Sequence, residues 1–145
     1  MRLLPSLTAL AASTLSLSAC TPYDAPPTSP PSADECPAYE SRDWQAWINV
    51  MPGPNAKPTL HIQGEVDMPT PGWSVELIGG PADRMNPPGL RFRLEAEKPH
   101  GMVTQVITPT QVRYAETTPY SQIRQIIITC GDEALVTLTD VPIVQ

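Results

Sequence analysis

Two histidines, His61 and His100, are the only imidazoles that could serve as a general base in this 145-residue chain. Nucleophilic catalysis by Ser or Cys usually needs such a base within hydrogen-bond reach. His61 falls inside an alternating segment, His100 stands in a Pro-His-Gly turn, and no Gly-x-Ser-x-Gly motif occurs. The carboxylates stand singly on polar positions of alternating segments or in turns, as solvated side chains do. The sequence therefore predicts no catalytic residue and no enzyme.

Soft metal ligands form one short pattern, His100-Gly101-Met102, with an imidazole and a thioether two residues apart. Such ligands suit Cu(I), and periplasmic copper carriers use His-x-Met pairs on β-sandwiches. Met68, Met85 and His61 could join from elsewhere in the chain, but their spacing differs from that of such carriers. Met102 is more simply explained as the start of a strand. We therefore predict no metal and no cofactor, and keep a copper carrier as the third candidate function.

The first twenty residues have the form of an export signal. Met1-Arg2 supplies a short positive region, and residues 3–17 are largely apolar. This stretch is shorter than the ~20 apolar residues that a membrane span needs. It ends in Leu17-Ser18-Ala19-Cys20, which resembles the lipobox of bacterial lipoprotein signal peptides.

The lipobox resemblance implies that residues 1–19 are removed and that Cys20 becomes a lipidated N-terminus. Its thiol would carry a diacylglyceryl group and its amine an acyl chain such as palmitate, and two or more chains anchor a protein stably in a membrane. Thr21 follows Cys20, which in enterobacteria-like systems implies sorting to the outer membrane. An ordinary secretory signal or a retained N-terminal helix is the alternative. We expect a protein of the bacterial envelope that faces the periplasm.

With Cys20 assigned to lipid, Cys36 and Cys130 remain. An even number of cysteines in an exported chain predicts a disulfide. The bridge would close a loop that contains most of the folded region. Chain-entropy arithmetic gives a disulfide with a loop of this length about 4–5 kcal/mol of stabilisation. Two unpaired thiols are the alternative. Neither cysteine belongs to a Cys-x-x-Cys pair, so a redox or zinc role has no support.

Proline content and charge narrow the class of protein. The chain has 19 Pro, and its formal net charge is −6. The acidic balance argues against a nucleic-acid partner, and so many prolines exclude a mostly helical protein. Prolines crowd residues 20–37, which predicts a disordered, extended tether. The folded domain is expected over residues 38–145.

Short alternating segments separated by Pro and Gly recur along this domain. In residues 90–97 apolar and charged side chains alternate strictly, as in a half-buried antiparallel strand. The run Ile126-Ile127-Ile128 indicates a central strand covered on both faces, and Gly79-Gly80 and Gly131-Asp132 indicate tight turns. Pro109 and other prolines are expected between strands. We predict a single antiparallel, Ig-like, all-β sandwich of seven or eight strands, with strands at 44–50, 59–64, 73–77, 90–97, 103–108, 111–116, 122–130 and 134–141.

Two segments carry a further similarity. Residues 69–77 run Pro-Thr-Pro-Gly-Trp into a strand, and residues 99–109 begin Pro-His-Gly and end Thr-Pro. They resemble loops of small envelope β-sandwiches of the protease-complex-associated and protease-inhibitor type, over residues 60–115. The chain lacks the second Gly-rich loop and the Arg-Pro-Trp-like third loop of the inhibitors, so the resemblance does not extend to inhibition itself. It implies a recognition loop formed by Pro69, Thr70, Pro71, Gly72 and Trp73.

A purely structural explanation of the same loop stays open. Pro-Thr-Pro-Gly breaks the chain, Gly72 permits a positive φ, and Trp73 then starts a core strand. A second candidate surface is the long connection over residues 79–89, which carries Arg84 and Met85, because long loops on a rigid sheet are frequent binding sites.

Two tryptophans just after the tether, Trp44 and Trp47, could pack on the core edge or stay exposed. The function predicted is a membrane-anchored, non-enzymatic binding or accessory module for an envelope protein, such as a protease or a multi-subunit complex. The alternative is a structural envelope lipoprotein within a larger assembly. The expected partners are the lipid bilayer, through Cys20, and an envelope protein.

Overall fold

The structure is a computed structural model that describes residues 35–54 and 56–145. The predicted lipobox with Cys20, the predicted signal segment 1–19 and the predicted tether up to residue 34 lie outside the described residues. Within them the chain forms eight strands, as the all-β prediction requires. The described part has no helix of the length and apolar character needed to cross a membrane.

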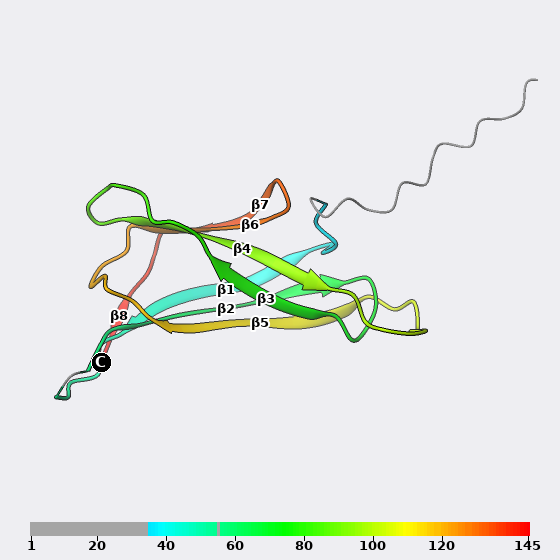
Figure 1. The fold of residues 1–145 in the computed structure, drawn as a ribbon, viewed down its shortest axis with the longest axis horizontal. Helices are drawn as coiled ribbons and strands as arrows, with labels where there is room; N and C mark the ends of the chain where they lie inside the picture. The colour runs from blue at the N-terminus through cyan, green and yellow to red at the C-terminus, as the bar shows by residue number, and fades with distance from the viewer. Residues whose placement is uncertain (1–34, 55) are drawn as a thin grey trace, which may run out of the picture.

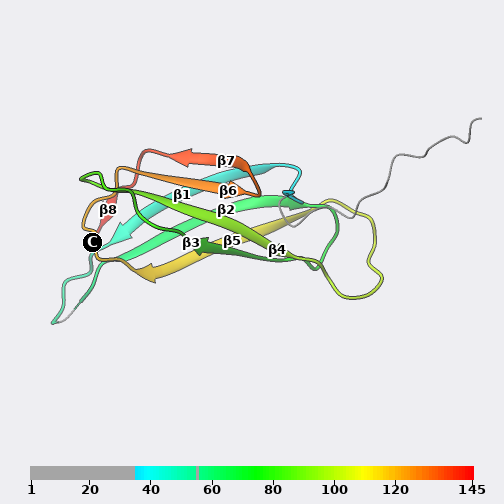
Figure 2. The same ribbon diagram turned by 45° about the horizontal axis from the view of Figure 1, so that its top comes forward.

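Two four-stranded sheets lie face to face (Figures 1 and 2). The first has the order β5-β2-β1-β8, and the second has the order β3-β4-β6-β7. The strands of the first sheet are β1 (Ser41–Asn49), β2 (Thr59–Met68), β5 (Thr108–Thr117) and β8 (Ile143–Val144). Those of the second sheet are β3 (Ser74–Gly79), β4 (Gly89–Glu97), β6 (Gln125–Cys130) and β7 (Glu133–Leu138).

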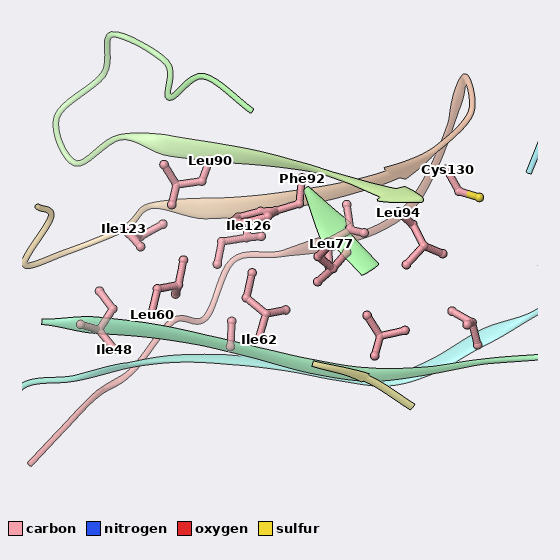
Figure 3. Packing of buried hydrophobic residues seen from close by; sticks show 14 of the residues in the cluster. Ile48, Leu60, Ile62, Leu77, Leu90, Phe92, Leu94, Ile123, Ile126 and Cys130 are labelled. Atoms are coloured by element: carbon pink, nitrogen blue, oxygen red, sulfur yellow. The ribbon is translucent and has the colours of Figure 1, made fainter. Parts of the chain in front are cut away.

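The core is one apolar layer between the two sheets. On β2 every second residue, from Leu60 to Met68, is buried, and the residues between them are only half-buried. Figure 3 shows Ile48, Leu60 and Ile62 of the first sheet pointing toward Phe92 and Ile126 of the second. A strand with period-two alternation can bury only one face, so the predicted sandwich follows directly from the sequence pattern.

The sheets are mixed, so the prediction of a purely antiparallel sandwich is wrong. β4 pairs with β6 in parallel, and β1 pairs with β8 in parallel. Between β4 and β6 the chain crosses to the other sheet as β5, which pairs there with β2. Two reversals of direction bring β6 back beside β4 with the same polarity. The alternation of apolar and polar residues carries no information about whether neighbouring strands run parallel or antiparallel.

The strand predicted over residues 103–108 does not form. β5 begins at Thr108, opposite Met68, which is the last residue of β2. Residues before Thr108 have no neighbouring strand to pair with, so 98–107 forms a loop and Met102 is fully exposed instead of starting a strand. Pro109 lies inside β5, contrary to expectation; β5 is the edge strand of its sheet, where a missing N–H is tolerated.

Two further local predictions need correction, and one is confirmed. Gly79-Gly80 is not a hairpin turn, because Gly80 N donates to Arg91 O at 2.8 Å and so continues the β3–β4 ladder. Ile127 is half-buried, because the two-layer sandwich leaves the outer face of β6 without a covering layer. Gly131, with φ 57°, does form the tight turn between β6 and β7.

A disulfide joins Cys36 and Cys130, 94 positions apart, as predicted. Cys36 precedes β1 of the first sheet, and Cys130 ends β6 of the second. The bridge therefore ties the entrance of the domain to the opposite sheet, and Cys130 is itself fully buried.

Removing this bridge should destabilise the domain. We expect the double variant Cys36→Ser/Cys130→Ser to lose about 2–5 kcal/mol of unfolding free energy, because the unfolded chain regains the freedom that the closed loop denies it. Equilibrium urea unfolding of the full chain measures this loss, and adding a reductant to the unsubstituted protein should reproduce it. A double variant within about 0.5 kcal/mol of the parent would contradict the expectation.

Candidate functional site

The loop over residues 69–73 borders a groove at one end of the sandwich. Three segments line it: the entrance of the domain with Cys36 and Pro37, this loop, and the β4–β5 connection with Pro99. The groove has a volume of about 470 Å³. We call it the proline groove, because each of the three segments contributes a proline to its wall: Pro37, Pro69 and Pro99.

Loop 69–73 is held rigidly. Trp73 Nε1 donates a hydrogen bond to Thr70 Oγ1 at 3.0 Å, and Thr70 is buried. Gly72 has φ 85°, as its place in the loop predicted, and a Cβ there would lie 3.2 Å from the Pro99 side chain. Trp73 itself lies just before β3 and packs against the core. The loop therefore meets the β4–β5 connection through close, fixed contacts.

The opposite wall is fixed by hydrogen bonds to the end of β2. Tyr39 N donates to Asp67 O, and Asp67 N donates to Glu40 O, each at 2.9 Å. Arg42 adds two bonds to the Asp67 carboxylate, at 2.6 and 2.9 Å, and pairs with Glu65. The Arg42 hydrogen bonds hold the pKa of Asp67 below its usual value. This network holds the segment that carries Tyr39 beside the groove.

The chemistry of the proline groove is that of binding. Its lining is mainly proline, aromatic and aliphatic, with Glu35 and Lys98 as its charged members and Gln105 as an amide. Neither histidine is among its lining residues. Rigid, largely apolar grooves with a few polar groups are typical recognition sites for extended peptide segments.

The second predicted surface lies at the other end of the molecule. In Figure 1 the β3–β4 connection, which carries Arg84 and Met85, is at the opposite end of the sheets from the β4–β5 connection. Asp83 fixes this connection: its Oδ1 accepts bonds from Gly89 N at 2.8 Å and Met85 N at 3.1 Å. Its Oδ2 pairs with Arg124 at 2.7 Å. The two predicted binding surfaces are thus separate.

The residues considered for copper are dispersed. His100 and Met102 lie in the exposed β4–β5 connection, whereas Met68 is fully buried in the core. His61 stacks on Trp47, with ring centroids 5.2 Å apart. Met85 is at the far end of the sandwich (Figure 1). Across residues 35–54 and 56–145, no three His, Cys, Asp or Glu side chains gather in a way that could hold a metal ion.

Sequence reasoning missed one wall of the proline groove. Cys36, Pro37 and Tyr39 contribute to it although they lie about thirty residues before loop 69–73. No local pattern marks them, since their position depends on the disulfide and on the pairing of Tyr39 with Asp67. Trp44 and Trp47, whose placement the sequence left open, separate: Trp44 packs against the core, and Trp47 lies half-buried on the outer face.

No protein-family model matches the chain, no curated protein is significantly similar to it, and no solved structure matches it significantly.

The β3–β4 connection should weaken in acid. Backbone N–H groups of Gly89 and Met85, and the Arg124 guanidinium, lower the pKa of Asp83. A carboxyl group with a lowered folded-state pKa stabilises the fold above its unfolded pKa of about 3.9, and the contribution is lost as pH falls through the folded value. We expect the difference in unfolding free energy between parent and Asp83→Asn to be largest near neutrality and to shrink below about pH 4. Urea unfolding over this pH range measures it.

The matched control is Glu133→Gln on β7, which removes an exposed carboxylate. Its difference from the parent should stay nearly constant over the same pH range. If Asp83→Asn and Glu133→Gln gave the same pH profile, Asp83 would not hold the connection.

Proposed function

We propose that this protein is an exported, lipid-anchored envelope module that binds another envelope protein through the proline groove. The observation that carries the proposal is the groove itself. It is built from three segments, of which hydrogen bonds hold the Tyr39 segment and the loop with the predicted recognition residues Pro69, Thr70 and Trp73. The fixed loop contacts mean that little order must be gained on binding, and such preorganisation favours affinity.

Export is supported by two independent features of the chain. The Cys36–Cys130 disulfide suits an oxidising compartment such as the periplasm. The segment Leu17-Ser18-Ala19-Cys20 resembles a lipobox and implies an acylated N-terminus at Cys20. Lipid attachment and a Pro-rich tether would keep the sandwich near the membrane, which raises its effective concentration toward partners there.

The partner's contact segment is best described as an extended, largely apolar peptide. The one side-chain donor of Trp73 is already bonded to Thr70, so the groove offers mainly aromatic and proline surfaces. Gln105, Lys98 and Glu35 line the same groove and can contact polar groups of the segment. The resemblance of residues 60–115 to protease-complex-associated sandwiches suggests a membrane protease or its complex as the source of that segment. A structural role within an assembly is the remaining alternative.

Intact mass spectrometry tests the membrane anchor. The full chain, made in a bacterium with an outer membrane and extracted from its membranes, should begin at Cys20 and carry the mass of its acyl chains. Alkylation should add to two cysteines only after reduction. A chain that begins at Met1, or at an unmodified Cys20, would contradict the lipoprotein proposal and leave the groove as a separate question.

Site-specific photocrosslinking tests the groove. A photoreactive residue replaces Tyr39 on the groove wall or, as the control, Met51 in the β1–β2 connection at the other end of the sandwich (Figure 1). The two side chains are similarly exposed, at 64% and 67%. In the organism that makes the protein, irradiation should give one discrete adduct from position 39 and none from position 51, and Trp73→Ala should reduce the adduct several-fold.

Two results would count against the binding module. Equal adducts from positions 39 and 51 would indicate unspecific neighbours, and an adduct that persists in Trp73→Ala would indicate contact without use of the groove. Adducts from many positions that are independent of Trp73 would favour the structural role.

A further inference from the structure

A second groove lies along the outer edge of β1, away from the proline groove. It has a volume of about 600 Å³ and runs between β1 and the chain that links β7 to β8. We call it the indole groove, because Trp44 and Trp47 line it. None of its lining residues belongs to the proline groove. We propose that the indole groove binds a neutral oligosaccharide.

The open edge arises because β8 covers little of β1. β8 pairs with β1 only at Ile48 and Asn49. Toward the N-terminus the chain leaves β8 through Pro142, whose carbonyl accepts from Ile48 N at 2.9 Å, and crosses to the second sheet. In the part of the chain that the structure describes, no strand pairs with the middle of β1 on that side. Both the core-facing and the outward side chains of β1 reach the groove.

Trp44 forms part of the wall at this edge. Its ring packs on Gly64 of β2, so closely that a Cβ at Gly64 would lie 2.3 Å from the ring. A bulge between Arg42 and Gln45 sets Trp44 in this position. Its Nε1 atom is buried and has no hydrogen-bond partner among the described residues. An atom without accessible surface does not reach a ligand in an open groove, so Trp44 contributes to the indole groove only as part of its wall.

Trp47 supplies an aromatic surface that is held in place. One side of its indole stacks on His61, with an interplanar angle of 8°. The half-buried ring also lines the indole groove. An aromatic face of this kind packs against apolar C–H surfaces such as those of a pyranose ring. His61 acts here as a positioning residue, since it fixes the ring without lining the groove.

The remaining lining groups suit hydroxyls. Gln45 contributes an amide, Thr137 and Thr139 contribute hydroxyls, and Asp140 contributes a carboxylate, and all four residues are exposed. The amide and the hydroxyls provide both donors and acceptors, which sugar hydroxyls need because each hydroxyl both donates and accepts.

Charge decides against an anionic ligand. Asp140 is the one charged residue among those that line the indole groove, and neither Lys nor Arg contributes. A phosphate, an acidic glycan or a fatty-acid carboxylate would meet a like charge and no cation. A quaternary ammonium group would need an aromatic cage, but Gly64 occupies a face of Trp44 and His61 a face of Trp47.

Backbone geometry decides against an added peptide strand. Ile48 and Val50 direct their N–H groups toward β8, and alternate residues of a strand direct their groups to the same side. Between the bulge and β8, Ala46 is therefore the one residue whose backbone faces the open edge. A single residue cannot support a ladder of the kind that peptide strands form on sheet edges.

A glycan microarray tests the proposal with the full chain in a detergent that has no sugar headgroup. The array carries neutral hexamers of β-linked N-acetylglucosamine, β-linked glucose and α-linked glucose, together with acidic glycans. We expect saturable binding of at least one neutral hexamer and none of the acidic glycans. Titration calorimetry with the best neutral hexamer should then show a loss of at least tenfold in affinity for Trp47→Ala.

Other variants separate ligand contact from folding. Asp140→Ala and Thr139→Val change exposed side chains and should each weaken binding several-fold without altering the thermal midpoint. Trp73→Ala, in the proline groove, is the matched control and should bind the hexamer as the parent does. If Trp47→Ala unfolds, the Asp140→Ala and Thr139→Val variants still test the proposal.

Three outcomes would overturn the proposal. The first is that no neutral hexamer binds. The second is that the protein prefers acidic glycans or tetramethylammonium. The third is that a neutral hexamer binds with unchanged affinity to the Asp140→Ala and Thr139→Val variants. None of these outcomes bears on the proline groove, so the two proposals can fail separately.

Discussion

The structure depends on one constraint, that two sheets share a single apolar layer. β2 buries one face in this layer over Thr59–Met68, and its other face is half-buried (Figure 3). Because the sandwich is only two sheets thick, concave surface can form at the strand ends and at the open edges of the sheets. Both grooves occur at such places, one where loops meet at an end of the sandwich and one beside the uncovered part of β1. Their position is a consequence of how the core is built.

The sequence predicts the parts of this fold that depend on local alternation. The strict pattern over residues 90–97 identifies β4, and the disulfide follows from counting cysteines. Strand partners and polarity depend on how distant segments meet, which explains the wrong expectations for residues 103–108 and for Pro109. The apolar residues Val106 and Ile107 look like part of a strand, yet they are exposed because β2 ends at Met68 and offers no further partner.

The same limit applies to the candidate sites. Gly72 and Trp73 could be singled out from the sequence, because a Pro-Thr-Pro-Gly turn before an aromatic residue has a local signature. Tyr39 has none, and it reaches the proline groove only because Asp67 holds its backbone and the disulfide fixes Cys36 nearby. The bridge thus has two consequences, since it ties the sheets together and also supplies part of a groove wall. Its loss would disturb the groove even where the sandwich still folds.

The surroundings of Trp44 show a local cost that core packing alone does not explain. Asp43 has a φ of 54°, a conformation that non-glycine residues rarely adopt, and it lies in the bulge that precedes the ring. Gly64 has no side chain although it lies in the middle of β2, where glycine weakens a strand. Both features accommodate a large aromatic ring over β2, and its Nε1 has no hydrogen-bond partner among the described residues. Backbone strain and unpaired donors tend to gather where a protein binds something, and at β1 they coincide with the groove that Trp44 and Trp47 line.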